Sequence, residues 1–204
     1  MAGFLSNFRN VIIVSLLLAA IFIVGFGYDS PSGFDGSFVI AVLRWAHVVC
    51  GILWVGLLYY FNFVQIRVMP NVPAELKPGI TKYIAPEALF WFRWSALLTV
   101  IIGLALAFHR GYLHEALTLG FINGYSPADT GFTFIGTGMW LGLIMMFNVW
   151  GLIWPAQKIA LGIKEGTPEQ KAAAAKKAMM FSRINTLLSL PMLVAMTMYQ
   201  TLFG

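Results

Sequence analysis

Polar side chains that interrupt long apolar stretches are the first candidates for chemistry in this sequence. Asn62, Gln65, Arg93, Asn148 and Arg183 lie in or beside such stretches. An unpaired polar group is costly inside a bilayer, so such side chains usually face another helix, a cavity or a ligand. Forked guanidinium and amide groups suit a flat, anionic, hydrogen-bonding substrate. An alternative is that the arginines reach lipid phosphate and the asparagines hydrogen-bond neighbouring helices.

The chain has three histidines, and two of them have the positions of haem ligands. His47 and His109 fall in consecutive apolar stretches that would run antiparallel and bring the imidazoles to similar depth. Axial ligation of haem b in a helical bundle uses neutral imidazoles in this arrangement. We therefore expect a haem b site at His47 and His109, and we assign His114 to the membrane interface. Copper is a weaker candidate, because the methionines form no Met-x-x-Met array with the histidines.

The asparagines and arginines belong to a pattern that occurs twice. Residues 54–62 and 140–148 both read W-x-G-L-x-x-x-F-N, 86 positions apart. The echo continues where R-W-S-A-L-L-T at 93–99 is matched by R-I-N-T-L-L-S at 183–189, 90 positions apart. A repeat of this kind predicts a duplicated helix pair with a polar site shared between the copies.

The repeat also divides the chain, which we interpret as a single transmembrane domain. Repeat 1 covers 39–108 and repeat 2 covers 132–204, while 1–38 would form an additional N-terminal helix and an outer loop. The histidines have no counterpart in the second copy. Any haem would therefore belong to the first half, separate from the duplicated polar residues.

Composition indicates a membrane protein. Apolar residues make up 59% of the chain and charged residues 10%, far from the values of a soluble domain. A helix needs about 20 apolar residues to cross the hydrocarbon core. Five windows of suitable length predict an all-α bundle of five transmembrane helices, at roughly 11–27, 39–66, 89–108, 132–154 and 184–203.

The basic residues predict the orientation of these helices. With the N-terminus in the cytoplasm, 11 of the 13 lysines and arginines lie at or near the inner face, and only Arg44 and Arg110 lie outside. The positive-inside rule therefore places the C-terminus outside. The net charge of +5 then faces anionic lipid headgroups, so we expect membrane lipids and no nucleic acid as partners.

Local sequence features predict how the first and last spans begin and what the single cysteine can do. We interpret the first apolar stretch as a retained helix, because no small-x-small cleavage site precedes Tyr28. Thr167 as N-cap, Pro168 and the alanines that follow predict a solvated helix leading into the last span. The single cysteine, Cys50, excludes an internal disulfide and a C-x-x-C-H site for covalent haem.

Six segments together resemble a known family. They lie, in order, at 45–65, 91–94, 139–142, 147–150, 154–158 and 183–192. They closely resemble the N-terminal membrane domain of the bacterial membrane-bound urate hydroxylase (urate oxidase) family, over roughly 39–200. The H-x-x-x-G-x-x-W-x-G-x-x-Y pattern from His47 to Tyr59 is also similar, more loosely, to small membrane protoporphyrinogen oxidases that bind haem b through a helix histidine.

The resemblance implies oxidation of urate or a related purine at the bacterial inner membrane, with electrons passed to a cytochrome c. Full-length members of the family carry a C-terminal cytochrome c domain, whereas this chain ends at Gly204 without a C-x-x-C-H motif. A separate cytochrome would then accept the electrons. The alternative is a non-catalytic accessory or assembly subunit of a larger membrane complex, and a transporter is a third possibility. In each case we expect an oligomer or a complex subunit.

Overall fold

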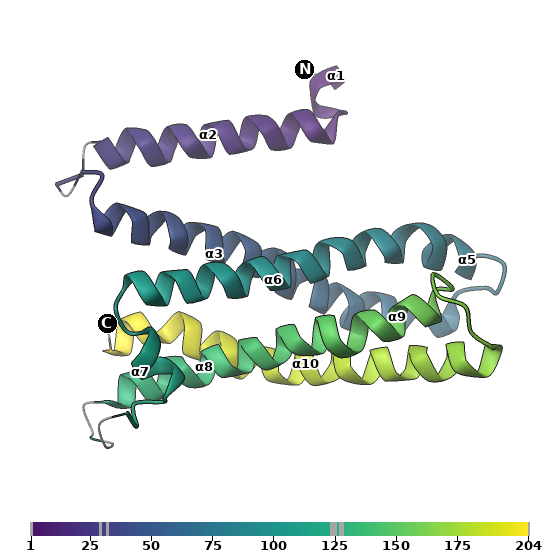
Figure 1. Ribbon diagram of the computed structural model, residues 1–204. Helices are drawn as coiled ribbons and strands as arrows, with labels where there is room; N and C mark the ends of the chain where they lie inside the picture. Colours follow the sequence, from purple (N-terminus) through teal and green to yellow (C-terminus); the bar gives the residue numbers. More distant parts are fainter. Residues whose placement is uncertain (1, 29, 32, 123–125, 127–128, 204) are drawn as a thin grey trace.

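The computed structural model describes residues 2–28, 30–31, 33–122, 126 and 129–203, and over these residues the chain is helical with no strand (Figure 1). Five helices are long and apolar enough to cross a membrane, which confirms the five predicted spans and indicates a multi-pass membrane protein. Consecutive spans run antiparallel, so the two ends of the chain lie at opposite ends of the bundle (Figure 1).

Several of the spans are built from more than one helical segment. The first is α2 (Phe8–Tyr28), preceded by the short α1 (Ala2–Leu5). The second combines α3 (Gly36–Tyr59), η1 (Tyr60–Gln65), α4 (Ile66–Val68) and η2 (Met69–Asn71). The third combines α5 (Lys77–Gly79), η3 (Ile80–Ile84) and α6 (Ala85–His109), and the short α7 (Leu113–Leu117) follows it. The fourth combines α8 (Thr130–Phe147), η5 (Asn148–Ile153) and α9 (Trp154–Ala160), and the fifth is α10 (Pro168–Phe203).

Side-chain caps fix the start of two spans. The Asp35 carboxylate accepts hydrogen bonds from the backbone N–H groups of Ser37 and Phe38 at 2.8 and 3.2 Å, and α3 begins there. Thr167 Oγ1 accepts from the Gln170 N–H while Gln170 Oε1 accepts from the Thr167 N–H, which is a capping box. The predicted N-cap is thus confirmed, and α10 continues from Pro168 through the last span without interruption.

The helices pack as two antiparallel pairs. α3 packs chiefly against α6, and the span made of α8, η5 and α9 packs against α10. The centre of the bundle is filled by Trp54, Leu58, Phe92, Met145 and Val149, each no more than 2% exposed. By contrast, α2 stands apart from the other spans, and Gly27 is the one buried residue of that helix (Figure 1).

Three of the spans contain a π-helical turn. In η1, η3 and η5 the closing N–H group bonds to the carbonyl five residues earlier. Two of these turns come just before a proline, Pro86 or Pro155, whose ring would clash with the carbonyl four residues before it in a regular α-helix. The wider turn removes this clash and bends the helix. Asn62 lies in the π-helical turn η1, and Asn148 lies in η5.

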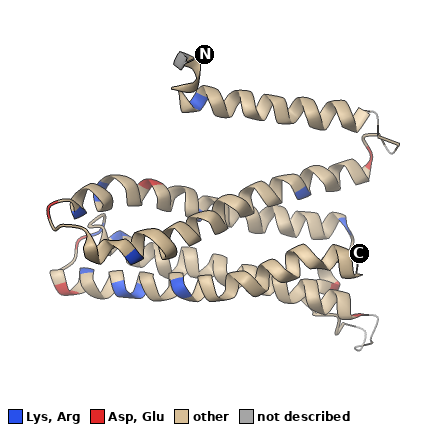
Figure 2. Cartoon of the chain, turned by 180° about the vertical axis from the view of Figure 1, so that it is seen from behind, with Lys and Arg blue, Asp and Glu red and all other residues tan. Residues whose placement is uncertain are grey.

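Charge is distributed unequally between the two ends of the bundle. Lysine and arginine gather at the end that carries α5, α9 and the start of α10 (Figure 2). Arg44, in the first half of α3, and Arg110, directly after α6, lie toward the other end. Apart from Arg93 and Arg183, the middle of each span carries no charge. The end rich in lysine and arginine is called the basic end below.

Candidate functional site

A stripe of small polar side chains runs along the buried face of α10. Ser182, Asn185 and Ser189 are spaced by three and four residues, so they share one face of the helix, and none is more than 7% exposed. Asn62 Nδ2 donates to Ser182 Oγ at 2.8 Å, and Asn148 Nδ2 donates to Asn185 Oδ1 at 2.8 Å. The structure therefore brings the two motif asparagines to neighbouring turns of the same helix.

The two asparagines differ in how completely they are hydrogen-bonded. Asn148 is paired with Asn185, whose own amide donates to the Met145 carbonyl at 2.9 Å. Asn62 uses its amide nitrogen twice, toward Ser182 and toward the Leu58 carbonyl at 2.9 Å. Its Oδ1 atom is buried and accepts no hydrogen bond from any residue that the structure describes. Asn148 thus joins helices, while Asn62 retains an unused buried acceptor.

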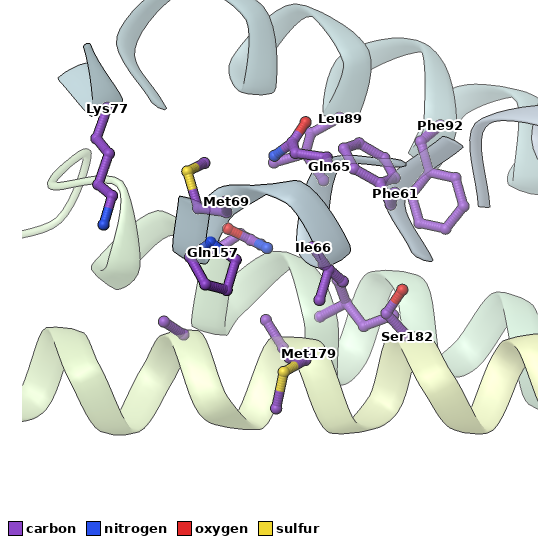
Figure 3. A pocket seen from close by; sticks show the side chains of 14 residues that line it. Phe61, Gln65, Ile66, Met69, Lys77, Leu89, Phe92, Gln157, Met179 and Ser182 are labelled. Atoms are coloured by element: carbon purple, nitrogen blue, oxygen red, sulfur yellow. The ribbon is translucent and has the colours of Figure 1, made fainter. Parts of the chain in front are cut away.

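A pocket of about 370 Å³ lies beside Asn62, at the basic end of the bundle. This volume is within the usual range for small-ligand sites. The walls are mostly apolar, and Gln65, Lys77, Gln157 and Ser182 supply the polar groups. Lys77 lies at one end of the pocket, and Phe92 and Ser182 lie at the other (Figure 3). The remaining lining residues are Phe61, Ile66, Met69, Pro70, Leu89, Ile153, Ala175, Ala178 and Met179.

The polar groups of the pocket are suited to a ligand that both donates and accepts hydrogen bonds. Gln65 Oε1 is buried and, like Asn62 Oδ1, has no donor among the described residues. Ser182 Oγ accepts from Asn62, so its own hydroxyl hydrogen is directed elsewhere. Lys77 and the Gln157 amide can donate to ligand oxygens. Unused buried acceptors in an apolar cavity favour a bound molecule with N–H or O–H groups.

The two arginines of the expected substrate cluster lie away from this pocket. The Arg93 guanidinium is stacked over the Trp154 ring, with Cζ 4.0 Å from the ring centroid. Arg183 follows the buried Ser182 by one residue and is therefore turned about 100° around α10, where it is exposed. Of the five expected substrate residues, only Gln65 lines the pocket. Asn62 adjoins it through Ser182, whereas Asn148 and both arginines do not contribute to the lining.

His47, on α3, packs tightly against α6. Its Nδ1 atom lies 2.8 Å from the Thr99 carbonyl oxygen, and a Cβ atom on Gly103 would lie only 2.7 Å from its Cε1 atom. Because a carbonyl can only accept, the proton is on Nδ1 and Nε2 keeps its lone pair. An imidazole that donates one N–H to a backbone carbonyl is the usual arrangement of a metal-ligating histidine.

His109 does not face His47. It lies six residues beyond Gly103 on α6, which is about 9 Å along the axis and about 240° around it. His109 is exposed, and its ring contacts Phe108 edge-on with the centroids 5.8 Å apart. The direct contact of His47 with α6 leaves no room for a macrocycle between the two rings. A haem ligated by both histidines therefore does not fit this packing, whereas His47 alone has the features of a single axial ligand.

Lys77 and Ser182 contribute to the pocket without having been expected from the sequence. Lys77 belongs to the polar connection after the second span, where it resembles an ordinary surface lysine. Ser182 comes one residue before Arg183, and the spacing of three and then four residues between the polar residues of 182–189 was the available indication of a buried stripe. No three His, Cys, Asp or Glu side chains gather into a metal-binding group in the described part of the chain.

Comparison with protein-family models, with curated proteins and with solved structures found no match to this chain.

Proposed function

We propose that this multi-pass membrane protein binds a small, flat, purine-like molecule in the pocket at its basic end. The observation that carries the proposal is the pair of unused buried acceptors, Gln65 Oε1 in a mostly apolar cavity and Asn62 Oδ1 beside it. Purines such as urate carry ring N–H donors that would pair with these oxygens. Lys77 would balance the negative charge of an anionic purine, and Phe61 and Phe92 offer aromatic surface to its ring.

The resemblance to urate hydroxylases extends this proposal from binding to oxidation. The substrate would be oxidised at the pocket, and a separate cytochrome would accept its electrons. His47 is the residue that would hold a haem b, with its tautomer set by the Thr99 carbonyl. A bound haem would supply an iron that accepts and releases single electrons. The proposed location is the bacterial inner membrane.

Orientation and duplication form part of the same proposal. The basic end would face the cytoplasm, with the N-terminus inside and the C-terminus outside, because lysine and arginine gather there (Figure 2). The two repeats would descend from one helix pair, since each copy places an asparagine in a π-helical turn that bonds to α10. The pocket would therefore open toward the cytoplasmic side.

Ligand binding is the direct test of the pocket. The purified chain in lipid nanodiscs should bind urate in a calorimetric titration. Gln65→Leu should weaken binding at least about tenfold, because a substrate N–H would be left unpaired in an apolar cavity. Gln200→Leu is the matched control, an exposed glutamine at the other end of α10. Equal affinity of Gln65→Leu and the unsubstituted protein would contradict the assignment.

Two further measurements test the redox part of the proposal. Membranes containing the chain should reduce added cytochrome c when urate is supplied. The purified protein should give a reduced-minus-oxidised haem b spectrum that His47→Ala abolishes and His109→Ala retains. A colourless preparation without bound iron would rule out the haem, and binding without electron transfer would limit the function to recognition.

A second candidate function, a subunit of a larger membrane complex, is favoured by one observation. α2 is a complete apolar span that contributes almost nothing to the bundle, with large side chains such as Ile21, Phe22 and Phe26 at least 64% exposed. Such a helix suits contact with another protein as well as with lipid. Copurification of the chain with a large complex in mild detergent, combined with no urate binding, would select this function over the enzyme.

A further inference from the structure

An aromatic cluster covers the side of the bundle where α6 meets η5 and α9. Trp94 and Trp150 are packed edge-to-face with their ring centroids 5.3 Å apart, and the Phe90 ring contacts both Trp91 and Trp94 on α6. Trp150 Nε1 donates to the Arg93 carbonyl at 3.0 Å and ties η5 to α6. Phe90, Trp91 and Trp94 are each 41 to 47% exposed, so the cluster reaches the lipid-facing surface.

Next to this cluster, two cations lie over the ring of Trp154 in α9. Arg93 Cζ is 4.0 Å from the Trp154 centroid and 5.3 Å from the Phe90 centroid, and Lys158 Nζ is 5.7 Å from the Trp154 centroid. Stacking on an aromatic face attracts each cation and holds the flat guanidinium in a defined plane. Two positive groups that share one ring in a half-buried place also repel each other. An anion between them would remove that repulsion.

The Arg93 guanidinium has an unused hydrogen-bond donor. Its Nη1 atom is buried and donates to no acceptor within the described chain. The carboxylate on the same stretch of α6, Glu87, accepts a hydrogen bond from Trp91 Nε1 at 2.9 Å instead. A fork-shaped guanidinium with free N–H groups pairs best with the oxygens of a phosphate or carboxylate.

The position in the bundle identifies the source of the anion. Lys158 is in the last turn of α9 at the basic end, and Arg93 packs on Trp154, one turn before Lys158 on the same helix. Tryptophan with arginine and lysine at this level is typical of the membrane interface. Beyond Trp94, the side chains of Leu98 and Ile101 continue the exposed apolar face at 44 and 52% exposure, which suits acyl chains.

We propose that Arg93, Lys158 and Trp154 bind the phosphodiester of an anionic phospholipid whose acyl chains lie along α6. The phosphate oxygens accept from the Arg93 fork and from Lys158, and the Trp154 ring keeps both donors in place. None of these three residues lines the pocket, and the lipid site does not depend on the proposed purine binding.

Native mass spectrometry of the full chain in detergent tests the lipid site. Titration with phosphatidylglycerol should show one tightly held lipid, and phosphatidylcholine should bind much more weakly. Arg93→Gln and Lys158→Gln should each weaken phosphatidylglycerol binding at least about tenfold, since each removes a charge-assisted hydrogen bond. Arg67→Gln is the matched control, because Arg67 is an exposed arginine at the same end of the bundle.

Other outcomes would overturn the proposal. If Arg93→Gln retains phosphatidylglycerol as well as Arg67→Gln does, the site is not at Arg93. If inorganic phosphate displaces the lipid at equal concentration, the site recognises a free anion and not a lipid. Arg93→Lys guards against a folding defect, since it keeps the charge but loses the planar fork. Arg93→Lys should keep the thermal midpoint of the unsubstituted protein and bind phosphatidylglycerol with an affinity between those of the unsubstituted protein and Arg93→Gln. Affinity equal to that of the unsubstituted protein would contradict the role of the fork.

Discussion

Asn62 and Asn148 occupy the same place in a repeated motif but have different roles. The amide of Asn148 is part of a closed chain of hydrogen bonds through Asn185 to the Met145 carbonyl. Asn62 bonds Ser182 and keeps its carbonyl oxygen unused. Asn62 lies beside the proposed binding pocket, whereas Asn148 joins η5 to α10.

Replacement of Asn185 should therefore affect stability and leave binding intact. In Asn185→Leu the Asn148 amide loses its acceptor inside the bundle, and the free energy of unfolding should fall by about 1–2 kcal/mol. Unfolding in an SDS titration measures this loss. Thr197→Val is the control, because it removes an exposed hydroxyl that bonds within its own helix, and it should change stability by less than about 0.5 kcal/mol. A loss of urate affinity in Asn185→Leu would instead place Asn148 in the site.

At the residue scale, the sequence identified polar side chains but not the direction in which they point. Asn62 and Gln65 were expected at a substrate site, and they lie at or beside the pocket. Arg183 was expected there too, but it is turned about 100° around α10 from Ser182 and is exposed. Hydropathy gives the depth of a residue in the membrane, whereas its angle around the helix depends on packing partners that the sequence does not reveal.

At the scale of single elements, close approach between helices depends on glycine. Gly136 on α8 faces the backbone carbonyl of Ala116 in α7, and a Cβ atom there would collide with that carbonyl. Trp140 Nε1 donates to the Leu117 carbonyl at 3.0 Å and secures the same contact. The short helix α7 is thus held against α8 by one glycine and one indole.

Gly136→Ala should destabilise the protein by about 1–3 kcal/mol, because backbone atoms cannot move aside as a flexible side chain can. Gly142→Ala is a matched change on the same helix, where a Cβ atom would meet nothing within 4 Å. It should be neutral or stabilising by up to about 1 kcal/mol through helix propensity. Thermal midpoints of the two variants test this. Equal destabilisation by Gly136→Ala and Gly142→Ala would show that the contact of α7 with α8 does not require glycine at position 136.

The helix α2 buries less of its surface against the rest of the chain than any other span does. Its most apolar window has no buried residue, whereas 44% of the corresponding window of the fourth span is buried. Replacement of residues 11–24 by leucine should change the unfolding free energy of the bundle by less than about 1 kcal/mol, because a leucine helix serves equally well in lipid. The same replacement over 135–148 should abolish folding. A severe loss from the first change would mean that α2 docks on the bundle.

For the molecule as a whole, the five spans could be predicted because their length and apolarity follow directly from the thickness of the bilayer. The start of α10 could be predicted because its capping box is local. Whether His47 and His109 face each other could not be predicted, because it depends on how α3 packs against α6. Gly103 allows His47 to pack directly on α6, and that contact separates it from His109. Local features of the sequence were therefore reliable, and contacts between helices required the structure.

The unequal charge of the two ends makes a prediction about the whole molecule in its membrane. In a Cys50→Ala background, Lys164→Cys tests the connection between α9 and α10, and His114→Cys tests α7 at the opposite end. If the basic end faces the cytoplasm, a membrane-impermeant maleimide should label His114→Cys in intact spheroplasts and Lys164→Cys only in inverted vesicles. Labelling with detergent present provides the control that both thiols react. The reverse pattern would place the pocket on the outer side, and a cytochrome at the inner face would then have to accept the electrons.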